Sequence, residues 1–288
     1  MPQQNLPDFD SLWDYSNPEQ SEVKFRTLLP QFKEDDAARL ELLTQIARAQ
    51  GLQGKFDEAH RTLNEVERLL DEKASRAHVR YLLERGRVFN SSKQQEKAKP
   101  YFEQAFEETR QLDEDFYAVD AIHMLAILAD PAAALTLNLR AIQLAESSTQ
   151  ARAQGWLGSL YNNMGWTYHD MGDFESALEM FVKAEAFRRS RNGANATRVA
   201  TWAVARCLRS LNQIEEALSR QLGLEKEFES VNETDGYVFE EIGECLLLLD
   251  RKEEARPYFA KAYEALSQDQ FLMANEAERL ERLKKLGG

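Results

Sequence analysis

One stretch, Leu160 to Ser190, restricts the fold more than any other part of the sequence. It reads LYNNMGWTYHDMGDFESALEMFVKAEAFRRS, two segments with apolar residues at helical spacing on either side of a Gly-Asp turn. The small residues Gly165 and Ala177 lie one on each predicted helix, where the two backbones would approach closely. Phe174 and Phe181 would fill the adjoining space. The stretch therefore predicts a pair of closely packed helices.

Counted so that Gly165 is position 8, this stretch resembles the tetratricopeptide repeat. It has large residues at positions 4, 7, 11 and 24 and small ones at positions 8, 20 and 27. The closing proline of that repeat is absent, since position 32 is Arg189. The resemblance implies an all-α fold, a right-handed superhelix of about six helix pairs with capping helices at both ends. The segments 9–30, 117–127 and 138–146 also resemble stretches of free-standing bacterial members of this family.

The small residue at position 20 recurs along most of the chain, which indicates an array of repeats. The intervals run from 36 residues (Ala98 to Ala134) to 43 (Ala134 to Ala177), above the family's usual period of about 34. We expect longer helices, rather than long loops, to absorb the excess. The third copy is degenerate because Asp130-Pro131 shortens its turn. The position-20 residues are Ala59, Ala98, Ala134, Ala177, Ala217 and Ala255.

We predict one domain, a single repeat solenoid over residues 1–288. It would have an N-terminal cap at 1–36, six repeats over 37–266 and a C-terminal capping helix at 267–288. Asn17 and Pro18 mark a helix start within the N-terminal cap, because they suit the N-cap and first helical positions. The aromatic residues of this segment, including Phe9 and Trp13, either cover the first repeat or form a docking element for a partner.

Composition narrows the class of partner. The net charge of -13 argues against nucleic acid, because phosphate binding needs clustered Lys and Arg. No apolar run approaches the roughly 18 residues of a membrane span, so no membrane association is expected. The opening MPQQNLPDFD lacks the basic start and apolar stretch of a signal peptide. We therefore expect a cytoplasmic protein.

The reactive side chains do not form a known catalytic pattern. Cys207 and Cys245 both occupy position 10 of adjacent repeats, which favours packing residues rather than a disulfide. The sequence has no HExxH, CxxC, GxSxG or phosphate-loop motif. The acidic runs 34–36 and 113–115 stand near predicted helix starts, where negative charge complements the helix dipole. We expect no enzyme activity, no cofactor and no metal.

Because the sequence has no catalytic pattern, we expect its function to lie in a binding surface. In the family that this chain resembles, positions 2, 5, 9 and 12 of each first helix line the concave face. On that face repeats two, four and five place four Arg and no acid. Arg binds carboxylates through paired hydrogen bonds, Trp supplies rigid apolar area, and Asn bonds backbone amides. The predicted peptide-binding residues are Arg48, Arg80, Arg87, His123, Asn162, Trp166, His169, Trp202, Arg206 and Arg209.

The predicted function is a protein- or peptide-binding scaffold whose ligand is an acidic or C-terminal segment. Trp166 and Trp202 could instead pack between adjacent first helices, and the sequence leaves both interpretations open. Of the carboxylate clamp in chaperone-binding members of the family, only Asn163 is matched, so a copy of that clamp is not expected. The alternative functions are a signalling-peptide sensor and a self-associating structural protein, which would be a homo-oligomer.

Overall fold

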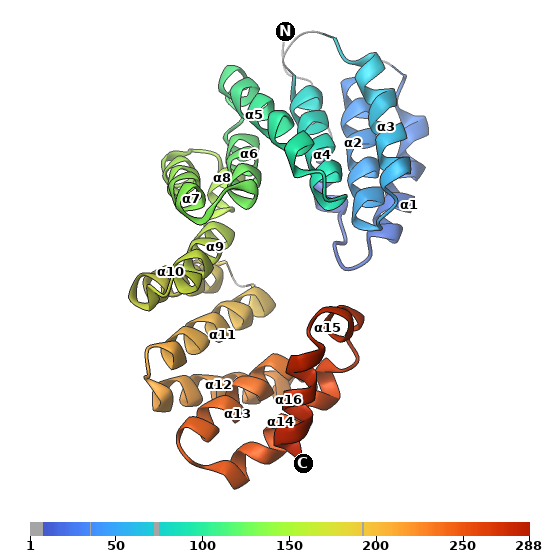
Figure 1. Ribbon diagram of the computed structural model, residues 1–288. Coiled ribbons are helices and arrows are strands. Elements are labelled where there is room, and N and C mark those ends of the chain that lie inside the picture. The colour runs from blue at the N-terminus through green and yellow to red at the C-terminus, as the bar shows by residue number, and fades with distance from the viewer. Residues whose placement is uncertain (1–7, 35, 72–74, 192) are drawn as a thin grey trace. The chain divides into compact units, whose positions relative to one another are not determined.

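The computed structural model describes residues 8–34, 36–71, 75–191 and 193–288, and all of its regular elements there are helices (Figure 1). Residues 1–7 of the predicted cap and Asp35 of the first acidic run lie outside this range. The chain divides into two units, Met1–Trp156 (unit 1) and Leu157–Gly288 (unit 2), which we describe one at a time. The predicted all-α repeat fold is confirmed, and the single domain over 1–288 stays a prediction.

Unit 1 contains helix α1, which packs on α2, and three helix pairs, α2/α3, α4/α5 and α6/α7. They correspond to the first three predicted repeats. A short helix, α8, follows the third pair. The bounds are η1 Phe9–Leu12, α1 Pro18–Leu28, η2 Leu29–Gln31, α2 Ala37–Leu52, α3 Phe56–Leu69, α4 Arg76–Ser91, α5 Gln95–Leu112, α6 Asp115–Leu128, α7 Pro131–Ser147 and α8 Ala151–Gln154.

Unit 2 contains three further helix pairs, α9/α10, α11/α12 and α13/α14, and a C-terminal helix that packs on α14 (Figure 1). The bounds are α9 Leu157–Asp170, α10 Phe174–Ser190, α11 Ala194–Ser210, α12 Ile214–Ser230, α13 Gly236–Leu248, α14 Lys252–Leu266, α15 Gln270–Asn275 and α16 Ala277–Gly287. The segment 267–288, predicted as one capping helix, thus contains two helices. Glu276, with φ -130° and ψ 37°, breaks the helical backbone between them.

The helices of the six pairs have 13 to 18 residues, so helix length absorbs part of the long repeat period as predicted. The longest interval is different, because the separate helix α8 and the Gly155-Trp156 turn lie within it. Pro131 opens α7 as expected, and the Asp130 side chain accepts a hydrogen bond from the Ala133 amide.

Within three pairs, a glycine at position 8 lies against a phenylalanine ring at position 24. A Cβ atom at these glycines would lie 2.5, 2.6 and 2.9 Å from the nearest ring carbon, closer than real contacts allow. The absent side chain therefore lets the two helices of each pair approach. The three contacts are Gly86 with Phe102, Gly165 with Phe181, and Gly243 with Phe259.

The turns inside five of the six helix pairs contain one residue of left-handed backbone, and the Ala129-Asp130 turn of α6/α7 does not. Gly54 and Gly172 supply it at φ 74° and 80°, where glycine is favoured. The second repeat has no glycine in its turn, and Lys93 takes this conformation instead, at φ 61°. A polar residue can thus take the place of glycine in this turn, so the second repeat forms without a turn glycine.

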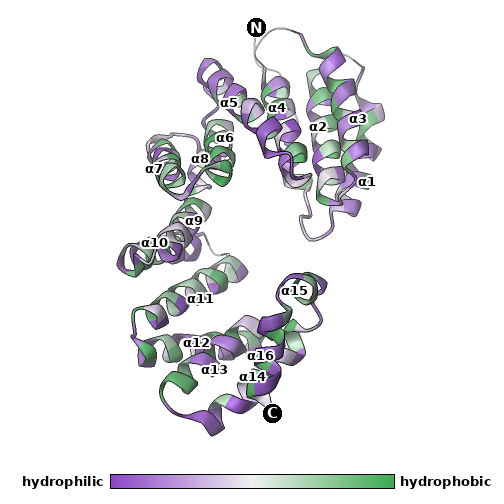
Figure 2. Cartoon of the chain, viewed as in Figure 1, coloured by the Kyte–Doolittle hydropathy of each residue, from purple (hydrophilic) through white to green (hydrophobic). Residues whose placement is uncertain are grey.

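Burial follows the predicted framework. Figure 2 shows α6 as hydrophobic along most of its length, and its residues from Tyr117 to Ile122 are all buried. Cys207 and Cys245 are buried and free, which confirms them as packing residues. No described helix combines the length and apolarity needed to cross a membrane.

Candidate binding faces of the two units

The predicted binding residues fall into two groups, because the array divides after Trp156. We call the exposed and half-buried side of α2, α4, α6 and α8 the unit-1 face, and the corresponding side of α9, α11, α13 and α16 the unit-2 face. The unit-1 face holds Arg48, Arg80, Arg87 and His123. The unit-2 face holds Asn162, Trp166, His169, Trp202, Arg206 and Arg209.

Two of the unit-1 arginines belong to a ladder of alternating charge. Arg48 Nη1 lies 3.2 Å from Glu84 Oε1, and the same oxygen accepts a hydrogen bond of 2.5 Å from Arg87 Nη1. Arg87 also binds both carboxylate oxygens of Asp120 on α6. Glu84 and Asp120 therefore balance Arg48 and Arg87, so Arg87 does not add the acid-free positive charge expected of the second repeat. Glu84 stands at position 6, outside the four positions from which the face was predicted.

Arg80 is buried, with only 5% of its surface exposed, and is thus no simple surface contact for a ligand. Its guanidinium donates to Asp10 Oδ1 at 2.7 Å and to the Tyr117 hydroxyl at 2.6 Å. Burial alone would lower the pKa of Arg80, but Tyr117 and Asp10 beside it raise the pKa above its ordinary value. For an acid such as Asp10, burial alone would raise the pKa. The neighbouring Arg80 and Arg152 guanidiniums instead hold the pKa of Asp10 below its usual range.

The N-terminal aromatic segment supplies this unexpected acid. Phe9 is 2% exposed and meets the Phe32 ring edge-on at 5.9 Å. The Trp13 indole N–H donates to Gln45 Oε1 on α2 at 2.8 Å, and its ring stacks on Tyr15 at 4.9 Å. The segment thus covers the unit-1 face rather than extending into solvent, although Tyr15 remains 59% exposed.

His123 completes the predicted unit-1 residues. Its ring is half-buried and lies 5.2 Å from the Trp156 ring. Burial lowers the pKa of His123 from its ordinary value. The imidazole is therefore neutral near pH 7, which suits a packing contact better than an anion contact.

The unit-2 face has a row of aromatic rings from three consecutive first helices. The Trp166 and Trp202 centroids are 6.0 Å apart, and the Trp202 and Tyr237 centroids are 6.2 Å apart. The Trp202 indole N–H also donates to the Tyr237 carbonyl at 3.2 Å. Both tryptophans do pack between adjacent first helices, as the second interpretation held. They remain half-buried, so part of each ring still reaches the surface.

A cavity of about 340 Å³ opens beside this row. Trp202 and Tyr237 form one side, and Val199, 56% exposed, stands at its edge. The lining is largely apolar, with one guanidinium and one carboxylate. The remaining lining residues are Arg198, Phe228, Asp235 and Val238.

Arg206 and Arg209 share a single buried carboxylate on the unit-2 face. Arg206 Nε lies 3.0 Å from Glu241 Oε1, while Arg209 makes paired hydrogen bonds of 2.7 and 3.0 Å to the same group. Burial disfavours the charged form of each group, so it lowers the pKa of Arg206 and raises the pKa of Glu241. Glu241 at position 6 was missed for the same reason as Glu84. Nearby Glu240 and Glu244 pair with Arg279 and Arg282 of α16, so counted by direct ion pairs Arg206 and Arg209 exceed their common acid by one charge.

His169, another predicted residue, adjoins this cluster on the α9 side. Ser210 Oγ accepts a hydrogen bond of 2.8 Å from Arg206 Nη1 and lies 3.0 Å from His169 Nε2. Burial lowers the pKa of His169, so the ring is neutral near pH 7. Asn162 is half-buried, and its amide approaches the Asn163 side chain at 3.5 Å.

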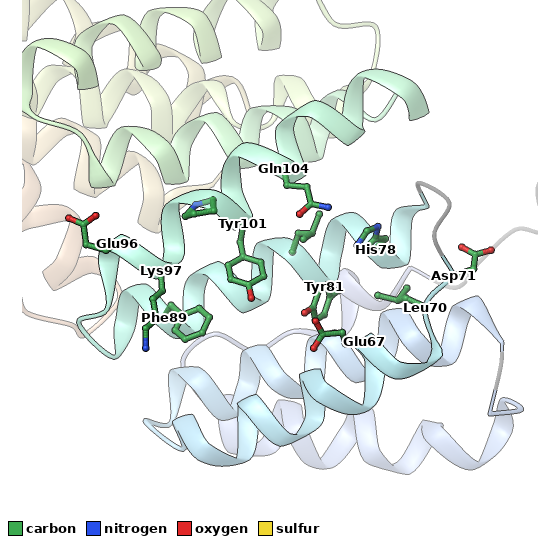
Figure 3. Close-up of a pocket in the computed structure, with 12 residues that line it drawn as sticks. Glu67, Leu70, Asp71, His78, Tyr81, Phe89, Glu96, Lys97, Tyr101 and Gln104 are labelled. Atoms are coloured by element: carbon green, nitrogen blue, oxygen red, sulfur yellow. The ribbon is translucent and has the colours of Figure 1, made fainter.

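Unit 1 also has a pocket of about 810 Å³ on another side, between α3, α4 and α5 (Figure 3). Figure 3 shows Tyr81, Phe89 and Tyr101 between these helices. His78 Nδ1 lies 3.0 Å from Glu108 Oε2 nearby. This pocket was not predicted, because its residues stand at positions that pack one repeat on the next. Among the described residues, no group of three or more His, Cys, Asp or Glu side chains could hold a metal ion.

Comparison with known proteins bears on the family. A family model described as tetratricopeptide repeat matches residues 79–111 and 158–190, one repeat in each unit. No curated protein sequence matches the chain.

Several solved structures share the fold. The apo form of RapI is similar over 91% of this chain and 76% of that chain, with a TM-score of 0.71 and 12% identity. The apo form of the quorum sensor NprR from B. thuringiensis matches 96% of this chain and 83% of that chain, with a TM-score of 0.61 and 14% identity.

A tetratricopeptide repeat protein from Parabacteroides merdae matches 97% of this chain and 95% of that chain, with a TM-score of 0.55 and 15% identity. At these identities the similarity concerns the fold. The family model identifies tetratricopeptide repeats at residues 79–111 and 158–190, and the glycine–phenylalanine contacts of α4/α5 and α9/α10 lie within them.

Proposed function

We propose that the protein is a binding scaffold whose unit-2 face takes a peptide segment of a partner. One observation supports this proposal above the others. Arg206 and Arg209 share the single carboxylate of Glu241, and this surplus positive charge adjoins a row of half-buried aromatic rings. Repeat arrays generally act through extended binding surfaces of this kind.

The proposed ligand is an acidic segment or a C-terminus with a neighbouring apolar side chain. Its carboxylate would meet Arg206 and Arg209, because guanidinium groups bind carboxylates through paired, charge-assisted hydrogen bonds. The apolar side chain would enter the cavity between Val199, Trp202 and Tyr237, which is large enough for one aromatic or branched group. Asn162 would bond the peptide backbone beside Trp166.

The similarity to NprR, described as a quorum sensor, supports a sensor form of the same proposal. In that form the ligand is a small signalling peptide rather than a segment of a larger protein. The chemistry of the face is unchanged, so the first experiment is the same for both.

The experiment is a peptide-library screen followed by titration of the hits against matched variants. Arg206→Gln removes the surplus charge, and Arg251→Gln removes an exposed guanidinium paired only with Glu254 in the α13–α14 turn. Affinity should fall about tenfold for Arg206→Gln, equivalent to about 1.4 kcal/mol, and should not change for Arg251→Gln. Trp202→Ala should also weaken binding of peptides with an apolar residue. Equal affinity of the peptide for wild type and Arg206→Gln would show that the binding site lies elsewhere.

A further inference from the structure

We infer that the unit-1 face recognises an extended segment with an acidic residue three positions before an aromatic one. Residues 8–15 of the chain itself are its resident occupant, which a partner segment of the same chemistry displaces. This inference rests on the proposed function only in treating first-helix faces as peptide-binding surfaces. It concerns a different unit, a different set of residues and a regulatory consequence.

The acid of the resident segment is held between two arginines from different helices. Asp10 accepts hydrogen bonds from Arg80 on α4 and from Arg152 on α8. Both guanidiniums also have contacts that do not involve Asp10: Arg80 donates to the Tyr117 hydroxyl, and Arg152 lies 4.1 Å from the centre of the Phe116 ring. The two cations are therefore positioned by the repeats, ready for a carboxylate.

The aromatic residue of the segment has its own contacts. Gln45 accepts a hydrogen bond from the Trp13 indole, and its amide is oriented in turn by a 3.1 Å hydrogen bond to Thr44 Oγ1. The Arg48 guanidinium lies 5.8 Å from the centre of the Trp13 ring, within the range of a cation–π contact. Every one of these groups belongs to α2, so this subsite also exists without the segment.

A single turn of 3₁₀ helix sets the spacing between the two subsites. The Asp10 amide donates to Asp8 Oδ1 at 3.2 Å, and the Trp13 amide donates to the Asp10 carbonyl at 3.4 Å. This turn directs Asp10 and Trp13 to the same side, toward the helices. An acidic residue and an aromatic one at this spacing form the recognition element.

The charges of the unit-1 face explain why its ligand should be acidic. Without Asp10, Arg80 would keep only Glu41 as a nearby anion, with 3.6 Å between Arg80 Nη1 and Glu41 Oε2. The acid with which Arg152 pairs is Asp10 itself. Two cations would then face one acid, in an otherwise acidic chain. An acidic ligand restores the balance, whereas a neutral one leaves Arg80 buried and undercompensated.

The segment is attached more weakly than the capping helix that follows it. Its contacts with the face are mainly polar, and Phe9 is its one large apolar side chain that is fully buried. Helix α1 contacts the segment through Phe25, 5.0 Å from the Trp13 ring, and through Ser21, which hydrogen-bonds the Asp14 backbone. It is also packed on α2 independently of the segment, and Glu22 Oε2 accepts a hydrogen bond from Gln53 at 2.9 Å. Residues 8–15 can therefore leave while α1 remains as the cap.

The test compares the wild-type chain with the variant Asp10→Asn/Trp13→Ala, using a fluorescent peptide of residues 8–16 added in trans. In the wild-type chain the attached segment competes at an effective concentration of the order of millimolar. The peptide should therefore bind the variant at least about tenfold more tightly than the wild type. The same peptide with Asp10→Asn should lose this affinity.

Asp14→Asn in the peptide is the matched control. It removes one negative charge four residues along, where the carboxylate accepts hydrogen bonds from Ser16 and Asn17 at the start of α1. This peptide should bind the variant chain as the natural one does. Equal losses for Asp10→Asn and Asp14→Asn would overturn the proposed recognition, because they would reduce it to net charge.

Circular dichroism first establishes that the variant chain keeps its helices. Should it unfold, hydrogen exchange in the wild-type chain provides the test, since saturating peptide should raise exchange of residues 9–13 and leave α1 protected. Unchanged exchange, or equally weak binding by both folded chains, would overturn the inference. If the variant chain dimerises and the peptide dissociates the dimer, the displacing partner would be a second copy of this chain. The unit-2 titration uses other residues, so either proposal can fail alone.

Discussion

At the scale of single residues, the glycine at position 8 is the tightest point in three of the helix pairs. Gly165→Ala should destabilise the protein by about 1–3 kcal/mol, because its new Cβ would overlap the Phe181 ring. Gly223→Ala is the matched control, since no atom lies within 4 Å of a Cβ at that helical position. It should stabilise by roughly 0.5–1 kcal/mol. Thermal or urea unfolding of both variants checks the pair, and equal midpoints would show that Phe181 yields without cost.

The arginines of the unit-2 face stabilise the fold more than exposed charges would. Arg209→Glu should cost about 3 kcal/mol or more, because it removes the paired hydrogen bonds of buried Glu241 and adds a like charge beside it. Arg251→Glu replaces a fully exposed arginine and should leave stability nearly unchanged. Urea denaturation of the two variants is the measurement. A small loss for both would mean that the Glu241 pair is dispensable.

A buried histidine gives the protein a pH dependence. Burial lowers the pKa of His123 in the folded state, so the unfolded chain binds more protons from about pH 6.5 downward. The stability that neutral His123 contributes to the folded state is therefore lost as the pH falls. His123→Gln should lose less thermal stability than the wild type between pH 7.5 and 5.5. Identical losses for the two proteins would contradict this assignment.

At the scale of helices, periodicity alone predicted the elements well. The position-8 and position-20 residues located all six pairs, since close helix contact requires a small side chain whatever the surface residues are. The break at Glu276 was missed because ANEAERLERLKKL keeps its helical pattern through it. Helix α8 was missed as a separate element for a similar reason, as apolar residues continue into α9.

The candidate site was predicted less well, and the reason is physical. Four positions per repeat describe which side chains face the surface, but ion pairs depend on neighbours in the next repeat. Arg87 pairs with Asp120, and Arg209 with Glu241, each one repeat further along the chain. Asp10 comes from outside the repeats, so no count of repeat positions could assign it to Arg80.

The capping helix provides a prediction at this scale. Removing residues 1–29 should cause aggregation, because it exposes the apolar side of α2 against which α1 packs. Removing residues 1–15 keeps α1 and should leave a folded, monomeric protein with a lower melting temperature. Size-exclusion chromatography and circular dichroism compare the two. A soluble, equally stable product of the longer deletion would show that α1 is no cap.

At the scale of the whole molecule, the net charge of -13 and an acidic ligand have the same sign. Binding must therefore depend on local cations that act over distances shorter than the Debye length, about 8–10 Å at physiological salt. The surplus charge at Arg206 and Arg209 meets this condition, since their common acid, Glu241, neutralises only one of them. Nucleic acid, with many phosphates in a row, meets repulsion along most of its length.

Salt therefore distinguishes local recognition from the field of the whole protein. Affinity for an acidic unit-2 ligand should fall only a few-fold between 50 and 500 mM salt, because one surplus charge is involved and part of it is already screened at the lower concentration. A neutral version of the peptide should bind more weakly and show almost no dependence. Titration by fluorescence anisotropy at four salt concentrations measures both. Affinity that rises with salt would mean that repulsion by the acidic chain dominates and that the arginine cluster does not hold the ligand.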